Sequence, residues 1–372
     1  MEGTVRQYIA EHQQELLELT LQLCQIPAPT GQEDARAAFC RDWLRRSGAG
    51  DVTIDRAKNV ICTIGVTPGR PVAVFLAHLD TVFPDTAPFT PRTEGARLYC
   101  PGAFDDTANV AALLMAARYV LRSGRQPRCG VVFAANTCEE GLGNLKGSRA
   151  LLDALGEDVC QVVSFDLGLD TVFTGAVGSA RYRICLETAG GHSYLDFGKP
   201  NAIAQMAELI CALYRQPVAP GATFNVGQIS GGTSVNTIAQ RAELLYEYRA
   251  ETAAAMAAME ENLRRIAAPF LPEITLLGRR PGTGACRDPE RQTSLLNDIC
   301  AAVTAETGHA PRRIIGSTDC NIPFSRGIPA ACVGLVYGSG AHTRQEYILP
   351  ESLAQGLGVA LRLICPLFNL PV

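Results

Sequence analysis

The sequence predicts an α/β protein with a mainly parallel sheet, into which a smaller α+β domain is inserted. Two observations lead to this fold class. First, near-continuous apolar runs, typical of strands buried on both faces of a parallel sheet, alternate with helical patterns. Second, the order of the predicted elements changes in the middle of the chain. The apolar runs are VAVFLA (72–77), GVVFAA (130–135), QVVSF (161–165) and ACVGLV (331–336).

The helices of the α/β domain can be followed in chain order. Periodic apolar residues predict helices over 4–24 and 31–46, before the first buried strand. The segment TANVAALLMAARYVLRSG, at 107–124, lies between the first two apolar runs. Its pattern predicts a crossover helix that ends at Gly124, since glycine commonly follows the last turn of a helix.

Residues 178–288 follow a different order of elements. The predicted order is strand, helix, two strands, helix and strand, which is that of a ferredoxin-like unit. The strands are ARYRICLET, TFNVGQIS, AELLYEYRA and EITLLGR. We therefore expect the α/β domain in two parts, residues 1–177 and 289–372, separated by an inserted domain.

The composition excludes several classes of protein. The chain has 372 residues, of which 47% are hydrophobic and 19% charged, so it can build packed cores. A net charge of −4 without a basic run argues against nucleic acid or anionic membranes as partners. The longest apolar stretches, such as 108–121, are too short and too polar to span a membrane. The 14 cysteines form no CxxC pair, and the N-terminus has the pattern of an amphipathic helix rather than a signal peptide. We expect reduced thiols and a cytoplasmic location.

Each apolar run leads into side chains that can bind a metal ion. In an open α/β sheet, ligands bind beyond the carboxyl ends of the strands, so these side chains can converge. Taken singly, each has an ordinary interpretation as a loop histidine, a helix N-cap or a solvated carboxylate. Together they form a mixed nitrogen and oxygen set that suits zinc, cobalt or manganese. The residues are His78, Asp80, Glu139, Glu140, Asp166 and His342, with Asp105 and Asp106 in the loop before the crossover helix.

Six motifs, in this order and at this spacing, resemble the M20 family of dinuclear zinc peptidases and deacylases, which includes carboxypeptidase G2-like, aminoacylase-1-like and tripeptidase T-like enzymes. They are HLDTVFP, GAFDDTANVAALL, CEEGLGNLKGSR, GGHS, GGTSVNTIA and GSTDCNIP followed by GAHT. The resemblance covers essentially the whole chain. It implies a zinc-exopeptidase-like catalytic domain and an inserted lid that also serves for dimerisation.

The resemblance implies two divalent metal ions, zinc with cobalt or manganese as alternatives. Asp105 would bridge the two ions. His78 and Asp166 would bind one ion, and His342 and Glu140 the other. Asp80 would orient the His78 imidazole from outside the ligand set.

The resemblance also assigns catalytic and substrate-binding residues. Glu139 would be the general base, and His192 of GGHS would contact the substrate carbonyl, in this family often in the neighbouring subunit of a homodimer. Asn236 and Arg249 match substrate-binding residues of the lid, and Arg249 would hold a free carboxylate. Three residues depart from the pattern: Phe104, a candidate for shaping the pocket, Cys138, whose ordinary interpretation is a buried thiol, and Ser317, where a glycine is common.

The chemistry of amide hydrolysis explains why two glutamates stand side by side at 139 and 140. Two cations about 3.5–4 Å apart can share a water molecule and lower its pKa toward about 7. A carboxylate that is not consumed as a ligand must then take the proton and pass it to the leaving nitrogen. Adjacent residues that leave a strand point in different directions, so Glu140 can face the metal while Glu139 faces the water.

The leading hypothesis is therefore a metal-dependent hydrolase of small peptides that carry a free carboxylate. An N-acyl-amino-acid deacylase with the same site is the alternative, and activity on N-acetyl amino acids against free peptides would separate the two. A metal-dependent phosphoesterase is disfavoured because the chain has no Walker-type glycine-rich loop. A catalytically silent binding protein is disfavoured because Glu139 and His192 are both present.

Overall fold

The computed structural model describes residues 4–372, which form two compact units. The large unit contains the chain up to Gly175 together with Ala285–Val372, and the inserted unit is Ala176–Gly284. Each unit has a hydrophobic core of its own.

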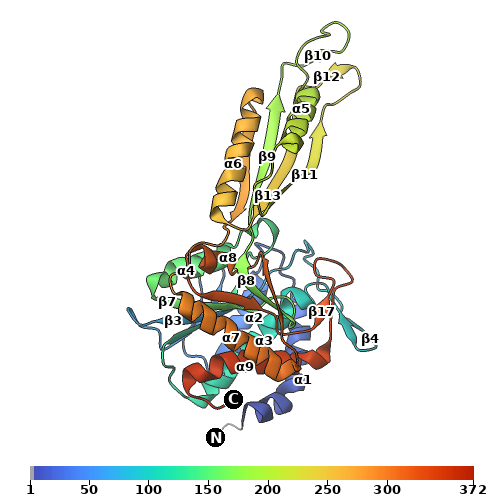
Figure 1. The fold of residues 1–372 in the computed structure, drawn as a ribbon. Helices are drawn as coiled ribbons and strands as arrows, with labels where there is room; N and C mark the ends of the chain where they lie inside the picture. Colours follow the sequence, from blue (N-terminus) through green and yellow to red (C-terminus); the bar gives the residue numbers. More distant parts are fainter. Residues whose placement is uncertain (1–3) are drawn as a thin grey trace. The chain divides into compact units, whose positions relative to one another are not determined.

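An eight-stranded sheet forms the centre of the large unit (Figure 1). Its order is β1-β2-β6-β3-β7-β16-β8-β15, and the four strands β6, β3, β7 and β16 in the middle are parallel. Antiparallel strands flank them on both sides. The mainly parallel α/β fold class is thus confirmed. The strands are β1 (Val52–Ile54), β2 (Val60–Ile64), β3 (Val72–His78), β6 (Gly130–Asn136), β7 (Val159–Ser164), β8 (Thr171–Ala176), β15 (Arg312–Gly316) and β16 (Ala330–Val333).

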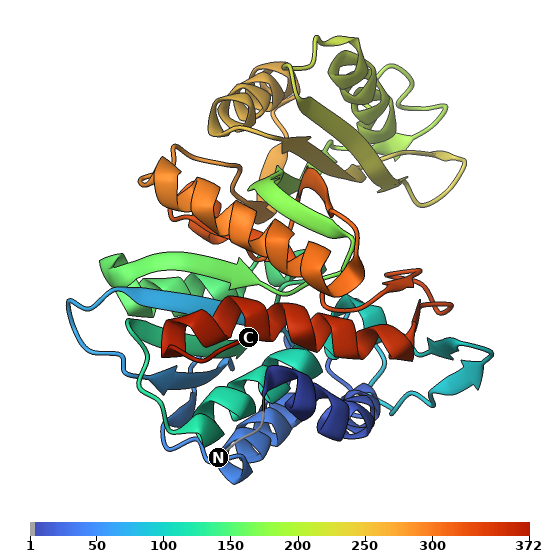
Figure 2. The same ribbon diagram turned by 60° about the horizontal axis from the view of Figure 1, so that its bottom comes forward.

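Helices cover this sheet, and the larger group packs on one face of it (Figure 2). On that face Phe75 of β3 stacks between Phe133 and Phe165, with ring centroids 5.9 and 6.1 Å apart. The crossover helix α3 ends at Gly124, whose φ of +65° is the left-handed conformation that glycine adopts readily. The helices are α1 (Val5–Cys24), α2 (Asp34–Arg46), α3 (Ala108–Ser123), α4 (Lys146–Leu155), α7 (Pro289–Thr307), α8 (Asn321–Ser325) and α9 (Leu353–Ile364).

A second, smaller sheet of the large unit has no counterpart in the sequence prediction. Its strands β4 (Arg92–Glu94), β5 (Arg97–Tyr99), β17 (Gly338–Ser339) and β18 (Tyr347–Ile348) pair in the order β17-β18-β5-β4. The prediction of a strand over 331–336 is wrong at its carboxyl end. The observed strand β16 stops at Val333, and the chain then continues into this small sheet. Its tyrosines pack across the ladder, with the rings of Tyr99 and Tyr347 5.4 Å apart. The short turns are η1 (Ala103–Thr107), η2 (Gly141–Gly143), η3 (Gly156–Asp158), η5 (Pro350–Ser352) and η6 (Cys365–Phe368).

Helix α9 and its flanking turns, Pro350–Phe368, form the one described stretch that is long and apolar enough to cross a membrane by length and composition. The sequence analysis predicts no stretch that could span a membrane. The segment has a mean hydropathy of 1.2, and 61% of it is buried inside the protein. It packs against α1, α3 and α7, so its apolar residues are those of a core helix.

The inserted unit has the predicted strand and helix order of a ferredoxin-like unit. Its antiparallel sheet has the order β11-β13-β9-β14. Alternate residues of β13 are buried, as expected for a sheet with one face against helices. Side chains of Asn201 and Thr252 cap the two main helices. The elements are β9 (Gly178–Glu187), β10 (Gly191–His192), α5 (Ala202–Arg215), β11 (Ala222–Gly231), β12 (Thr237–Ile238), β13 (Arg241–Ala250), α6 (Ala253–Ala267), η4 (Ala268–Phe270) and β14 (Glu273–Arg280).

Candidate metal centre

The parallel strands β3, β6 and β7 bring their carboxyl ends to one edge of the sheet. His78 is the last residue of β3 and pairs with Asn136, the last residue of β6. Leu76 of β3 pairs with Ser164, the last residue of β7. The chain segments that follow these strands carry Glu139, Glu140 and Asp166, so the acidic side chains gather beside His78 because the strands are parallel and in register.

Asp105 lies between the two histidines and turns one oxygen toward each. Its Oδ1 is 3.0 Å from Nε2 of His78, and its Oδ2 is 3.2 Å from Nε2 of His342. Asp105 belongs to the short turn η1, and its side chain is buried. One carboxylate that faces two imidazoles with separate oxygens has the arrangement of a ligand that bridges two cations.

Two further carboxylates complete the surroundings of the histidines. Oε1 of Glu140 is 3.1 Å from Nε2 of His342, and Oδ1 of Asp166 is 3.9 Å from Nε2 of His78. Three groups of side chains have ligand atoms within 4.8 Å of one another. These groups are His78, Asp105 and Asp166; His78, Glu139 and Glu140; and Asp105, Glu140 and His342.

His342 reaches this cluster by a different route from the one predicted. It does not follow a strand of the central sheet but lies in the loop between β17 and β18 of the small sheet. Its φ is +67°, in the left-handed region that residues other than glycine seldom adopt. The hairpin therefore holds His342 in an uncommon backbone conformation, and its side chain is the most exposed of the cluster.

The backbone oxygen of Asp80 selects the tautomer of His78. Nδ1 of His78 is 3.0 Å from this carbonyl, which can only accept a hydrogen bond, so Nδ1 carries the proton. In the neutral ring Nε2 then keeps its lone pair on the side of Asp105 and Asp166. A metal-binding histidine commonly donates its other N–H in this way.

The carboxylate of Asp80 holds the turn that bears the two glutamates. Its Oδ1 accepts the backbone N–H of Glu139 at 2.9 Å, and its Oδ2 accepts that of Glu140 at 3.0 Å. Thr30 donates a third hydrogen bond to Oδ2 at 2.9 Å. Asp80 thus contacts both His78 and the glutamate turn, and it fixes the direction in which the two adjacent acids leave the strand.

Asp106 and Glu346 support the site in ways that the sequence did not reveal. The Asp-Asp pair resembles a helix N-cap, but Asp106 instead accepts the backbone N–H of His78 at 2.8 Å. The buried Glu346 carboxylate accepts three backbone N–H groups, from Gly102, Phe104 and Asp105, at 2.8–2.9 Å. Glu346 lies four residues after His342. One segment therefore carries one histidine and also clamps the loop of Asp105.

The charges of the cluster fit a cation. Oδ1 of Asp166 is buried and has no hydrogen-bond partner among residues 4–372. Burial and the neighbouring Asp105 carboxylate raise the pKa of Asp166 to about 8. Hydrogen bonds to Asp105 and Glu140 raise the pKa of His342 to about 10. Protons thus occupy an acidic cluster that attracts positive charge, and divalent ions would displace them on binding.

Two of the residues that depart from the motif pattern, Cys138 and Phe104, have structural explanations. The thiol of Cys138 lies 3.4 Å from Oε1 of Glu33, and burial raises its pKa to about 12, which keeps it protonated. The ring of Phe104 is buried and so close to Gly338 that a Cβ there would meet the ring at 2.4 Å. Phe104 therefore packs into the core and supports the loop of Asp105.

The remaining predicted residues belong to the inserted unit, where His192 and Asn236 lie together. β10 and β12 pair His192 with Thr237, and the N–H of Ser193 donates to the carbonyl of Asn236 at 3.0 Å. Figure 1 shows this two-stranded ribbon at one end of the unit, beyond the end of β9. The His192 side chain is exposed, and its Nδ1 accepts the backbone N–H of Tyr194 at 3.2 Å.

Arg249 lies at the opposite end of the inserted sheet. It pairs with Ser179 near the start of β9, whereas Arg241, at the other end of β13, pairs with Glu187. Its Nε donates to Oε1 of Glu247 at 2.7 Å. Arg249 follows Arg241 by eight positions along the strand, a distance of roughly 26 Å. Within one inserted unit, therefore, Arg249 is not brought together with His192 and Asn236.

Comparisons with known proteins place these features in context. Residues 74–365 match the model of the family described as Peptidase family M20/M25/M40. The chain is 27% identical over 330 residues to a succinyl-diaminopimelate desuccinylase of Halorhodospira halophila, which covers 80% of this chain and 83% of the relative.

Two solved structures share the fold over almost the whole chain. A tripeptidase from Staphylococcus aureus superposes with a TM-score of 0.78 at 22% identity, over 96% of this chain and 99% of the other. An M20 family metallo-carboxypeptidase from Sulfolobus solfataricus superposes with a TM-score of 0.76 at 15% identity, over 94% of this chain and 98% of the other.

Proposed function

The chain belongs to peptidase family M20/M25/M40 and is a metal-dependent amide hydrolase, and on this premise we propose that it cleaves small peptides that carry a free carboxylate. The observation that carries the proposal is the position of Asp105, with one oxygen toward each histidine and with Glu139 and Glu140 beside it. This arrangement supports a site for two divalent ions next to a further carboxylate.

His78 and Asp166 would hold one ion, and His342 and Glu140 would hold the other. Asp105 would contact both ions. When bound, such a pair of divalent ions polarises the scissile carbonyl and makes water acidic enough to lose a proton near neutral pH. The mixed imidazole and carboxylate set suits zinc, with cobalt or manganese as alternatives.

Glu139 is the residue that would move the proton. It is buried beside His78 and Glu140, and Asp80 holds its backbone N–H. It would take a proton from the attacking water and give it to the leaving nitrogen. Glu140 is turned toward His342 and serves as a ligand, so the two adjacent acids have separate tasks.

The inserted unit supplies the substrate contacts in this proposal. His192 would donate a hydrogen bond to the carbonyl oxygen as negative charge develops on it, and Asn236 would contact the substrate beside it. Arg249 would hold the free carboxylate with two parallel hydrogen bonds. Because a tripeptide spans only about 10 Å, residues roughly 26 Å apart in one unit cannot contact the same small substrate.

This separation supports a homodimer in which one copy supplies Arg249 and the other supplies His192 and Asn236. Large apolar side chains next to His192 and Asn236 are exposed: Tyr194 by 82%, Phe197 by 90% and Val235 by 100%. Apolar residues grouped on a surface mark an interaction site, and a second copy would cover them. All 14 cysteines lie in the described residues and are free, which supports a reducing, cytoplasmic location.

A second candidate activity is the deacylation of N-acyl amino acids. The observation that favours it is the relative from Halorhodospira halophila, whose name describes a desuccinylase and which covers 80% of this chain. The same metal ligands and the same base would serve, because an N-acyl amino acid also presents an amide and a free carboxylate.

One experiment tests the class of reaction and chooses between the two substrates. The purified protein is analysed for metal content and then assayed on dipeptides, tripeptides and N-acyl amino acids with added zinc, cobalt or manganese. We expect two metal ions per chain and cleavage of free peptides that a chelator abolishes. Preferential cleavage of N-acyl amino acids would select the deacylase. A protein that binds no divalent ion under any of these conditions would contradict the proposed centre.

A further inference from the structure

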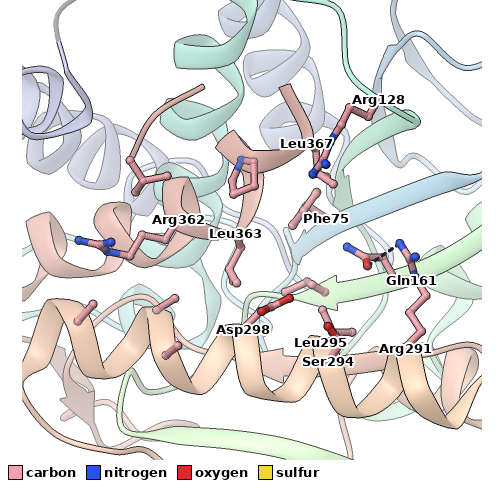
Figure 3. A pocket seen from close by; sticks show the side chains of 16 residues that line it. Phe75, Arg128, Gln161, Arg291, Ser294, Leu295, Asp298, Arg362, Leu363 and Leu367 are labelled. Carbon is pink, nitrogen blue, oxygen red and sulfur yellow. Dashed lines mark hydrogen bonds between the residues drawn. The ribbon is translucent and has the colours of Figure 1, made fainter. Parts of the chain in front are cut away.

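A cavity of about 540 Å³ lies in the large unit between helices α7 and α9, on the face of the sheet that carries Phe75 (Figure 3). Its volume is within the range of small-molecule sites. Strands β3 and β7 form part of its lining through Phe75, Gln161 and Val163. The metal centre does not involve any of these side chains.

The centre of the cavity is apolar. Phe75, Leu295, Leu363 and Leu367 line it, and Figure 3 shows Leu363 directed from α9 toward α7. Small side chains on α7, among them Ala301, leave room between the two helices. An apolar body of a small molecule would be held here by the removal of its surface from water.

One end of the cavity is positively charged. Arg128 and Arg291 lie there on either side of Gln161 (Figure 3). The exposed side chain of Arg128 makes no hydrogen bond or ion pair within residues 4–372. Arg291 donates to Oε1 of Gln161 at 3.0 Å and to Sγ of Cys160 at 3.4 Å, but its Nε is buried without a hydrogen-bond partner in the described chain. Two guanidinium groups with unused donors form a receptor for an anion.

The other charged side chains that line the cavity do not neutralise the positive charge of Arg128 and Arg291. Arg362 is paired with Glu306 outside the cavity lining. Asp298, on α7, makes no ion pair in the described part of the chain and lies nearer the apolar centre in Figure 3. The charged side chains of the lining are thus three arginines and one aspartate, on a chain whose net charge is −4, and Val372, the last described residue, also lines the cavity. An anion with an apolar body matches this distribution of charge and apolar surface.

The cavity is separate from the metal centre. Phe75 precedes His78 by three residues in β3, so their side chains point to opposite faces of the sheet and lie about 10 Å apart along the strand. Val163 likewise precedes Asp166 by three residues. A ligand in the cavity would contact the same two strands as the metal-binding residues, but from the other face.

We propose that this cavity is a second binding site, for a small organic carboxylate with a branched or aromatic apolar body. The carboxylate binds Arg128 and Arg291, and the apolar body packs on Phe75, Leu295 and Leu363. Hydrolysis of an amide always releases one carboxylate, so this class of compound is one that the enzyme itself produces. An amino acid with an apolar side chain belongs to the same class and would place its ammonium group toward Asp298.

Calorimetric titration of the metal-loaded protein tests the proposal. The probes are 4-methylpentanoate, leucine and leucinamide, which share an apolar body but differ in their charged groups. We expect 4-methylpentanoate or leucine to bind at millimolar concentration and leucinamide, which lacks the carboxylate, not to bind. Stronger binding of leucine would identify amino acids as the ligand, and stronger binding of 4-methylpentanoate would identify simple carboxylates.

Two variants assign the binding to the cavity. Arg128→Glu reverses the charge of an exposed side chain that has no partner, and Ala301→Phe fills the cavity from an exposed position on α7. Each should weaken the binding at least about tenfold, the size of one charge-assisted hydrogen bond. The matched control is Arg125→Glu, the same charge change three residues away on an exposed arginine that does not line the cavity.

Three outcomes would overturn the proposal. Affinity that is equal in all three variants would place the carboxylate at the metal centre or on the surface. If none of the probes bound, the cavity would not be a carboxylate-binding site. A change of molecular mass in solution in Arg128→Glu and Ala301→Phe, without a change in carboxylate binding, would make this face an interface between copies of the chain.

Discussion

The metal-binding edge of the large unit and the β10–β12 end of the inserted unit differ in how their candidate functional side chains are held. His78, Asp80, Asp105 and Glu140 are buried, and backbone or side-chain hydrogen bonds orient each of them. His192 is exposed, and apolar side chains around it are almost fully exposed to solvent. The first region is preorganised by the fold of one chain, whereas the second is open to solvent, and in the proposed homodimer another copy would complete it.

The difference follows from the architecture of the two units. Parallel strands deliver residues from distant parts of the sequence to one sheet edge, where the core covers them. A two-stranded ribbon at the end of an antiparallel sheet has no layer to cover it. In the proposed homodimer, binding and catalysis at such an end would depend on association, while those at the sheet edge would depend on folding alone.

The largest effect that we expect is that of Glu139→Gln. This variant tests whether Glu139 and Glu140 have separate roles, one as the base and the other as a metal ligand. The amide cannot accept the proton of water, so kcat should fall about a thousandfold or more while the metal content stays unchanged. Steady-state kinetics and metal analysis measure the two quantities. Glu140→Gln is the matched control, and it should lose bound metal. Turnover within tenfold of the unmodified protein would exclude Glu139 as the base.

Glu346→Ala tests the rigidity of the same edge without a change to any metal-binding or catalytic residue. Its carboxylate accepts three buried N–H groups in the loop of Asp105, and their loss should lower the free energy of unfolding by about 3 kcal/mol and weaken metal binding. Urea denaturation and metal titration measure these changes.

Glu346→Gln should have a smaller effect, because its side-chain carbonyl still accepts hydrogen bonds. Glu351→Ala, at an exposed position of the turn η5, serves as the control for the removal of a carboxylate. If Glu346→Ala were as stable as Glu351→Ala, the clamp on the Asp105 loop would have no energetic role.

His192→Ala tests whether the exposed end acts in the other subunit. Loss of one donor to the oxyanion should lower kcat about a hundredfold. The His192→Ala and Glu139→Gln variants can then be mixed in equal amounts. If Glu139 and His192 act on one substrate from different chains, half of the re-formed dimers would contain one intact site out of two. The mixture should therefore regain about a quarter of the activity of the unmodified protein.

The mixing experiment requires that subunits exchange, which native mass spectrometry of differently labelled chains can show. Exchange without recovery of activity would place His192 and Glu139 in the same chain's site, and the inferred separation of tasks between subunits would be wrong.

Val235→Glu should have the smallest effect on the stability of the folded chain and should act on the association of two copies. Its side chain is 100% exposed, so the folded chain should be as stable as before, while the dimer should weaken about tenfold. Sedimentation velocity over a range of concentrations measures the dimer. Val218→Glu, at a less exposed position between α5 and β11, is the control that should leave association unchanged.

Much of the fold was predictable because its signals are local. Unbroken apolar runs marked β3, β6 and β7, and Gly124 marked the end of α3. The ferredoxin-like order of the inserted unit also followed from short patterns. The small sheet with β17 and β18 was not predictable, because strands of two or three residues contain too little periodicity to recognise.

The residues of the candidate site likewise include some whose position was predictable from the sequence and some whose position was not. Glu139, Glu140 and Asp166 could be placed beside His78 from the sequence, since each follows a strand of one parallel sheet. The hairpin position of His342 and the three hydrogen bonds of Glu346 could not, since both depend on a hairpin that pairs with β5. Arg249 could be matched to a motif, but its position far from His192 is set by the antiparallel register of β13.

By itself, the sequence determined which residue types stand at the ends of buried strands, because burial on both faces and the two-residue period of a strand are properties of the local chain. The tertiary structure alone decided that Asp105 turns one oxygen to each histidine and that Glu346 clamps its loop. It also decided that a charged cavity lies between α7 and α9. These features join residues that are up to hundreds of positions apart, and such distances are set by packing, which no local pattern records.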